Sequence, residues 1–213
     1  AMGLLPSAVR LALARLSWTP KIDGKAVESA EEELLTDDQM IQLFDLADCQ
    51  KSPARFDMDK LNWMNQKLIQ RATWQDLEPH LRPFMPEAWT GKSDDFKRVA
   101  IQATQKGKAL TEMAEALRFA FERPAAFDEK AVEKFMIPAV KPALAEVRDL
   151  TDYDHAALET AFQAILERHG LKTKDLAQAL RVALCGKPVS PGIFDTLILV
   201  GREEVATRLS RWL

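Results

Sequence analysis

Apolar residues recur at helical spacing in nearly every segment of this chain, and this periodicity limits its fold more than any other feature. Leu176, Leu180 and Leu184, for example, are separated by four residues each and would line one side of a helix. No segment shows the convincing alternation of apolar and polar residues that marks a strand. Glycine is scarce, at 8 residues, and helix-favouring Ala, Leu, Glu and Lys are abundant. The sequence therefore predicts an all-α fold.

Capping signals predict where several helices begin and end. Thr36 followed by Gln39 predicts a capping box, and Ser190 followed by Pro191 predicts a helix start with a capping hydroxyl. The other predicted starts are Pro6, Asp57, Trp74, Asp128 and Thr173, and the predicted ends are Trp18, Gly170, Gly186 and Gly201. The polar segment 19–35 is expected to be a connection, and 82–92, which is dense in Pro, Gly and aromatic residues, is the best candidate for a boundary.

Composition limits the classes of protein to which the chain can belong. Its 213 residues, 47% hydrophobic and 29% charged, are typical of one large or two small soluble globular domains. No apolar run reaches the roughly 18 residues of a membrane span, and the start is not typical of a signal peptide. Cys49 and Cys185 are expected to be reduced, which is typical of a cytoplasmic protein. Because there is no apolar run, we also expect that the protein does not bind a membrane. A net charge of −3 argues against non-specific coating of nucleic acid but allows a local basic face.

Signatures of catalysis and of metal binding are absent from the sequence. There is no Gly-rich phosphate loop and no Cys or His pair at zinc spacing, and the histidines (His80, His155 and His169) are isolated. His169 before Gly170 is interpreted as a cation at a helix C-terminus, and the acidic run 28–33 as a solvated turn rather than a metal site. We therefore expect no cofactor, no metal and no enzymatic activity of this chain alone.

A basic stripe is predicted on the helix that follows Asp57. Lys60, Trp63 and Lys67, with Arg71 beyond them, are spaced three and four residues apart and would lie on one side of that helix. Its apolar side would carry Met58, Leu61, Leu68 and either Met64 or Asn65.

Three stretches resemble bacterial glutamyl-tRNA synthetases. Residues 181–201 (RVALCGKPVSPGIFDTLILVG) resemble the C-terminal signature of that family, 51–69 resemble a segment with a Lys and a Trp one turn apart, and 4–18 resemble the stretch after its ATP-binding Lys-Ser-Lys loop. The family's two ATP-binding motifs lie upstream of these stretches and are missing here. The resemblance implies that this chain does not activate glutamate, and that ATP belongs to the rest of a parent enzyme.

The resemblance also implies a domain organisation. By analogy, residues 1–75 would form a stem-contact domain and residues 76–213 an anticodon-binding domain, as two consecutive helical bundles. Its partner would be glutamate tRNA, with glutamine tRNA left open, and it would act as a monomer that does not bind DNA.

The residues implied to bind tRNA fall into three groups. Arg181 matches an arginine that reads an anticodon base, and a guanidinium offers a planar fork for base edges. The second group is the corner that would touch anticodon bases: Ser190, Pro191, Gly192 and Ile193, followed by Phe194, which is more typical of a core residue. The third group holds Lys60, Trp63 and Lys67 on the basic stripe, with Lys106 and Lys108 near the position of an arginine that judges the third anticodon base.

Each of these residues also has a plainer interpretation. Arg181 could be an ordinary surface arginine on a helix. Ser190 could be a simple helix cap, and Trp63 could be a core residue between helices. For the whole chain the alternatives are a free-standing tRNA-binding protein derived from a synthetase and a helical scaffold for protein partners. The function expected first is recognition of the anticodon arm of glutamate tRNA, by phosphate contacts for affinity and base contacts for specificity.

Overall fold

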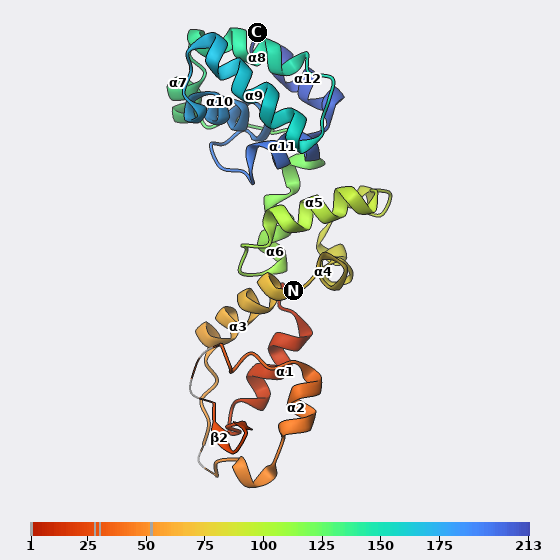
Figure 1. Cartoon of the computed structure of the whole chain (residues 1–213), viewed down its shortest axis with the longest axis vertical. Helices are drawn as coiled ribbons and strands as arrows, with labels where there is room; N and C mark the ends of the chain where they lie inside the picture. Colours follow the sequence, from red (N-terminus) through yellow and green to blue (C-terminus); the bar gives the residue numbers. More distant parts are fainter. Residues whose placement is uncertain (1, 28, 30, 52) are drawn as a thin grey trace. The chain divides into compact units, whose positions relative to one another are not determined.

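The computed structural model of the chain describes residues 2–27, 29, 31–51 and 53–213. Within these residues it contains twelve α-helices, five short 3₁₀ helices and one two-stranded sheet (Figure 1). The predicted all-α class is confirmed. The chain divides into two compact units, Ala1–Met85 with Gln105–Ala114, and Pro86–Thr104 with Glu115–Leu213. The predicted limits, 1–75 and 76–213, come from the analogy with a family and describe its domains rather than compact units. They stay a prediction.

The first unit is built on two helices that pack against each other, α1 (Pro6–Ala14) and α3 (Met58–Arg71). Its other elements are β1 (Lys21–Ile22), β2 (Lys25–Ala26), α2 (Asp37–Leu43), η1 (Leu46–Asp48), α4 (Trp74–Leu81) and η2 (Arg82–Phe84). A buried cluster of Leu11, Trp18, Leu34, Leu35 and Met64 lies between α1 and α3, and Met40 and Leu43 of α2 pack against it. Leu34 and Leu35 come from the segment before α2, so the polar connection ends in two core residues that fix it against α1 and α3.

The N-terminal part of this unit differs from the sequence prediction in two places. The first helix ends at Ala14 rather than near Trp18, and Trp18 instead forms an isolated bridge with Cys49. The segment expected to be a plain connection holds an antiparallel hairpin, in which Ile22 pairs with Lys25. Asp23 at its turn has a positive φ of 51°. The missed signal is the Asp–Gly dipeptide at 23–24, which is typical of two-residue hairpin turns.

The second unit is built around α10 (Thr173–Cys185). This helix buries eight of its residues and packs against α7, α8, α9, α11 and α12. The elements of the unit are η3 (Glu87–Trp89), α5 (Asp94–Thr104), η4 (Arg118–Ala120), α7 (Glu129–Phe135), η5 (Pro138–Val140), α8 (Lys141–Arg148), α9 (His155–His169), α11 (Ile193–Val200) and α12 (Arg202–Ser210). Helix α6 (Leu110–Ala116) contributes residues to both units.

Most of the predicted helix ends are confirmed, because short-range contacts produce them. Thr36 and Gln39 form the expected capping box, and Asp57 accepts hydrogen bonds from the first turn of α3. Gly170 and Gly186 end α9 and α10 in the left-handed conformation, as expected of helix C-caps.

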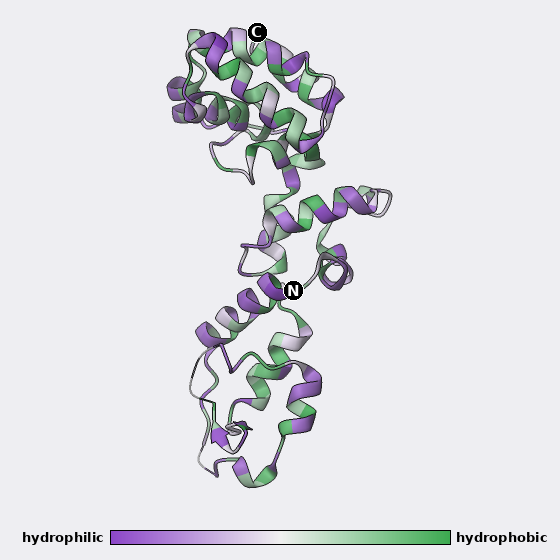
Figure 2. Cartoon of the chain, in the orientation of Figure 1, coloured by the Kyte–Doolittle hydropathy of each residue, from purple (hydrophilic) through white to green (hydrophobic). Residues whose placement is uncertain are grey.

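The distribution of hydropathy agrees with this arrangement. Helix α11 is largely apolar and buries five of its eight residues, whereas α3 has an apolar side and an extended polar side (Figure 2). Among the described residues, no helix combines the length and the apolar character needed to cross a bilayer. Glu28, at the start of the predicted acidic run, lies outside the described residues.

Candidate nucleic-acid interface

The corner between α10 and α11 brings the predicted anticodon-reading residues together. Arg181 lies in the last turns of α10, half-buried, and its Nε donates a hydrogen bond to the Ser190 hydroxyl at 3.2 Å. Its two terminal nitrogens make no hydrogen bond or ion pair with the part of the chain that the structure describes. The guanidinium is therefore held at one edge, and its other edge is free for a ligand.

Ser190 has a different role from the predicted helix cap. Helix α11 begins at Ile193 with Gly192 as its N-cap and without a capping side chain, so the prediction of a start at Ser190–Pro191 is wrong. The Ser190 hydroxyl instead lies 2.9 Å from the Thr196 hydroxyl and 3.0 Å from the Pro191 carbonyl, and Thr196 donates to the Gly192 carbonyl at 2.9 Å. These contacts fold the corner onto the first turn of α11 and orient Arg181.

Gly186 determines how the chain leaves α10. Its φ of +75° turns the backbone, and its carbonyl accepts a hydrogen bond from the Asp128 amide at 2.8 Å. An added Cβ at Gly186 would lie 2.5 Å from the Ala126 carbonyl oxygen, which is too close for any other residue type to fit without a shift. After this turn, Lys187 and Val189 are exposed, with Val189 at 70%.

The apolar residues of the corner are mostly used by the protein itself. Ile193 is only 8% exposed, which leaves little surface for a nucleobase. Phe194 is half-buried and packs edge to face on the rings of His155 and Phe162, with ring centroids 5.3 and 5.5 Å apart. Burial raises the pKa of the next carboxyl group, Asp195, and the nearby His155 partly offsets that rise. At this corner Ile193 and Phe194 are used for packing, and the exposed Val189 and the polar groups are left for a ligand.

A buried arginine that sequence analysis missed supports the same region. The Arg208 side chain is 5% exposed, and its Nη1 donates to the carbonyl oxygens of Leu184 and Phe119 at 2.6 and 2.9 Å. Its Nε donates to Glu204 at 2.8 Å, and Arg123 binds the same carboxylate through two hydrogen bonds of 2.7 and 2.9 Å. The only sequence signal was the four-residue spacing of Glu204 and Arg208, which usually marks an exposed pair.

A cavity of about 330 Å³ lies beside the end of α10. Cys185 and Lys187 line one side of it, and Arg118 and Arg123 line another. Burial raises the pKa of the Cys185 thiol to about 12, in spite of the nearby Arg208, so the sulfur stays neutral at physiological pH. The buried thiol thus contributes to packing at the end of α10.

The first unit brings Lys106 and Lys108 against α3. The buried Asn65 amide donates to the Lys108 carbonyl at 2.7 Å and accepts from the Leu5 amide at 2.7 Å. Gln66 donates to the Lys106 carbonyl at 3.2 Å. These bonds fix the backbone of the loop before α6, while both lysine side chains are exposed and form no ion pair within the described residues. Asn65 is therefore a buried bridge, which the sequence pattern could not distinguish from an apolar contact.

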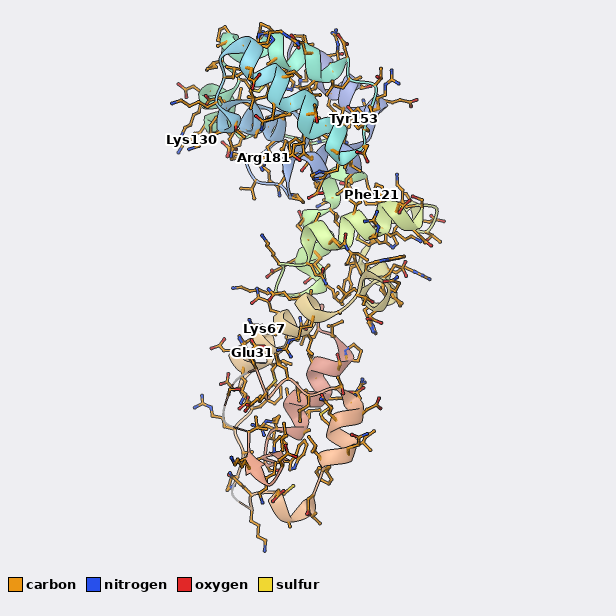
Figure 3. All side chains as sticks on the ribbon, in the orientation of Figure 1. Glu31, Lys67, Phe121, Lys130, Tyr153 and Arg181 are labelled. Atoms are coloured by element: carbon orange, nitrogen blue, oxygen red, sulfur yellow. The ribbon has the colours of Figure 1, made fainter. Side chains whose placement is uncertain are left out.

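The basic stripe of α3 is occupied by carboxylates of the chain itself. Lys67 pairs with Glu31 at 3.4 Å (Figure 3). Lys60 pairs with Glu33 at 2.7 Å, and Arg71 also pairs with Glu31. Trp63 is half-buried and packs on the core cluster of the first unit, which agrees with its plainer interpretation. The charged ends of Lys60, Lys67 and Arg71 are partly exposed, and each of them is paired with a carboxylate.

The family comparison identifies the larger part of the chain. The family model described as an anticodon binding domain matches residues 74–213. The chain is also 34% identical over 216 residues to a glutamate–tRNA ligase of Geotalea uraniireducens (strain Rf4), and 32% identical over 210 residues to glutamate–tRNA ligase 2 of Campylobacter curvus (strain 525.92). These alignments cover 99% and 98% of this chain but only 44% and 43% of the relatives, whose C-terminal part is the part matched.

Solved structures give the same result for the fold. The chain superposes with a TM-score of 0.83 and 26% identity on a glutamate tRNA ligase from Elizabethkingia meningosepticum, solved in complex with its amino acid. A glutamate–tRNA synthetase from Elizabethkingia anophelis gives a TM-score of 0.80 at 26% identity. Both superpositions cover 99% of this chain and 41% of the other.

Proposed function

Since the chain belongs to the anticodon-binding domain family and matches the C-terminal part of glutamate–tRNA ligases, we propose that it binds the anticodon arm of glutamate tRNA, with Arg181 reading a base. The observation that carries this proposal is that the Arg181 guanidinium is hydrogen-bonded to the protein at one edge only. Ser190 fixes Nε of Arg181, and the terminal nitrogens are left for a nucleobase edge or a phosphate.

Base reading in this proposal depends on a guanidinium that is oriented before RNA arrives. A fixed side chain loses less conformational entropy on binding than a free one, so more of the hydrogen-bond energy appears as affinity. The anticodon loop is single-stranded, and its bases can present their edges to such a donor. Pro191 and Gly192 directly follow Ser190, the hydrogen-bond partner of Arg181, and would approach the RNA backbone.

Phosphate contacts are assigned to exposed lysines. Lys187 is next to the corner in the second unit, and Lys106 and Lys108 are exposed on a loop in the first unit. A lysine is a point charge suited to phosphate but not a bidentate reader of a base, so these side chains would supply affinity without selecting the sequence. Glutamine tRNA stays a possible second ligand.

In a complete ligase, binding of the arm would position the acceptor end for ATP-dependent attachment of glutamate. The aligned relatives are longer than this chain, and that chemistry is assigned to their remaining part. We propose that this chain supplies recognition alone, as a cytoplasmic monomer.

The test is equilibrium binding of the chain to a glutamate tRNA transcript, a glutamine tRNA transcript and a glutamate tRNA with a changed anticodon. We expect Arg181→Ala to lose about 1–3 kcal/mol of binding free energy and to reduce the preference for the correct anticodon. Ser190→Ala should lose less, and it should add little to Arg181→Ala, because Ser190 acts by orienting Arg181.

Arg202 provides the matched control, because it is an exposed arginine of the same unit that lies at the start of α12. Arg202→Ala removes the same charge and should leave the anticodon preference unchanged. Equal binding to all three RNAs, with Arg181→Ala and Arg202→Ala indistinguishable, would contradict anticodon reading by this chain.

A further inference from the structure

The α3 cations contact carboxylate oxygens in the same way that they would contact phosphate oxygens. Glu31 pairs with Lys67 (Figure 3) and also with Arg71, and Glu33 pairs with Lys60. Carboxylates and phosphates compete for the same charge-assisted hydrogen bonds. The chain therefore covers part of its own basic surface, on a helix that is hydrogen-bonded to the loop of Lys106 and Lys108, to which phosphate contacts are assigned.

The two glutamates are held to different degrees. The Glu33 side chain is only 17% exposed, and its second partner, Arg15, is 8% exposed and also donates to the Trp18 carbonyl at 3.0 Å. Burial alone would raise the pKa of Glu33, but the hydrogen bond from Lys60 and the charge of Arg15 together lower it. Glu33 is thus part of the framework that holds its segment on α1 and α3.

Glu31, in contrast, is held only at the surface. Its side chain is 59% exposed, and its partners Lys67 and Arg71 are 35% and 45% exposed. Ion pairs between solvated side chains contribute little to stability, because water and salt screen them. An RNA phosphate that approached this side of α3 would meet a pair that is easily exchanged.

We propose that Glu31 is an intramolecular competitor for RNA phosphates, which holds Lys67 and Arg71 in the free chain and is displaced when tRNA binds. This inference rests on the proposed function, because it needs tRNA to reach α3. Glu33 anchors the segment, so Glu31 stays close to the cations and can re-form the pairs when RNA leaves. The competitor lowers affinity and favours release of the RNA.

Glu31→Gln, compared with Glu32→Gln, tests the inference on the full chain. Both changes remove one negative charge from adjacent positions. Glu32 is bonded to Ser29, through hydrogen bonds of 3.4 and 3.2 Å, and makes no ion pair with α3 among the described residues. With the glutamate tRNA transcript at low salt, Glu31→Gln should tighten binding roughly 3- to 10-fold and Glu32→Gln less than about 2-fold.

A double-mutant cycle with Lys67→Gln separates competition from a general charge effect. In the wild-type chain Lys67 is held by Glu31, so its removal should weaken binding only slightly. In the Glu31→Gln chain Lys67 is available to phosphate, and the same removal should weaken binding by a clearly larger factor. A general charge effect would give equal factors in the two backgrounds.

The outcomes distinguish the inference from the function on which it rests. If wild type prefers the correct anticodon while Glu31→Gln binds no more tightly than Glu32→Gln, the competitor role is overturned and anticodon binding stands. If neither wild type nor the variants bind the transcript, although circular dichroism shows all of them folded, the proposed function fails and the inference fails with it.

Discussion

At the residue scale, the carboxylate of Glu204 is the charge on which the buried Arg208 depends. Hydrogen bonds from Arg123, followed by those from Arg208, lower the pKa of Glu204 to about 2 from an ordinary value of 4.5, although partial burial opposes the shift. Because the folded pKa is the lower one, ionised Glu204 stabilises the fold. This stabilisation is complete above about pH 4.5 and is lost as the pH falls toward 2.

We therefore expect Glu204→Gln to lower the free energy of unfolding by about 2–4 kcal/mol at pH 7, since Arg208 would keep its carbonyl partners but lose its counter-charge. Urea unfolding followed by circular dichroism, repeated from pH 7 to pH 2.5, measures this. The difference from wild type should shrink below about pH 4.5, because Glu204 then becomes protonated in the unfolded chain while it stays ionised in the folded chain until the pH approaches 2.

Glu203→Gln is the matched control, because this neighbouring glutamate is exposed and makes no ion pair within the described residues. It should change stability by less than about 0.5 kcal/mol at any pH. A Glu204→Gln variant as stable as Glu203→Gln at pH 7 would show that Arg208 is satisfied by carbonyl oxygens alone.

At the element scale, the end of α10 illustrates how a single residue type determines the path of a loop. Gly186→Ala should destabilise the chain by about 2–5 kcal/mol, because the left-handed conformation and the approach to the Ala126 carbonyl both oppose a side chain. Gly170→Ala has a similar positive φ but an open surrounding, and should cost only about 1–2 kcal/mol. Thermal unfolding of both variants checks the difference, and equal losses would mean that the loop at 124–126 moves aside freely.

The elements that the sequence predicts well are those determined by contacts a few residues apart. The capping box at Thr36 and the left-handed ends at Gly170 and Gly186 involve near neighbours, and a local pattern describes them fully. Ser190 resembled a cap for the same reason. Its hydroxyl has a better-placed partner in Arg181, nine residues away across the turn, and that contact exists only once α10 and α11 pack.

The candidate interface is predictable only in part, for a related reason. The resemblance to synthetases led to Arg181 and its corner, which the fold brings together. It did not indicate that Lys67 and Arg71 would pair with Glu31, which is 36 and 40 residues away in the sequence. Nor did it indicate that Arg208 would be buried and would donate a hydrogen bond to the carbonyl of Phe119, which is 89 residues away. Such long-range pairs depend on the packed chain and leave no periodic trace in the sequence.

At the scale of the whole molecule, a chain with net charge −3 can bind RNA only through local cations. Many of its arginines and lysines are already paired. At the proposed contacts, the cations without an ion pair among the described residues are the exposed Lys106, Lys108 and Lys187 and the half-buried Arg181. As phosphate contacts with single-stranded RNA, the three lysines should give a slope of roughly −2 for log K against log salt concentration. Lys67 and Arg71, once they exchange Glu31 for RNA, should steepen it to roughly −3.5.

Base contacts do not release counterions as phosphate contacts do, so the two sets should respond differently to salt. Raising the salt concentration should weaken binding to the correct and to the changed anticodon by the same factor, and the ratio of the two affinities should stay constant. Titrations from about 50 to 200 mM salt measure both quantities. A ratio that falls toward one would place specificity in charge rather than in Arg181. A slope that stays near roughly −2 would show that Lys67 and Arg71 keep Glu31 as their partner when RNA binds, against the proposed exchange.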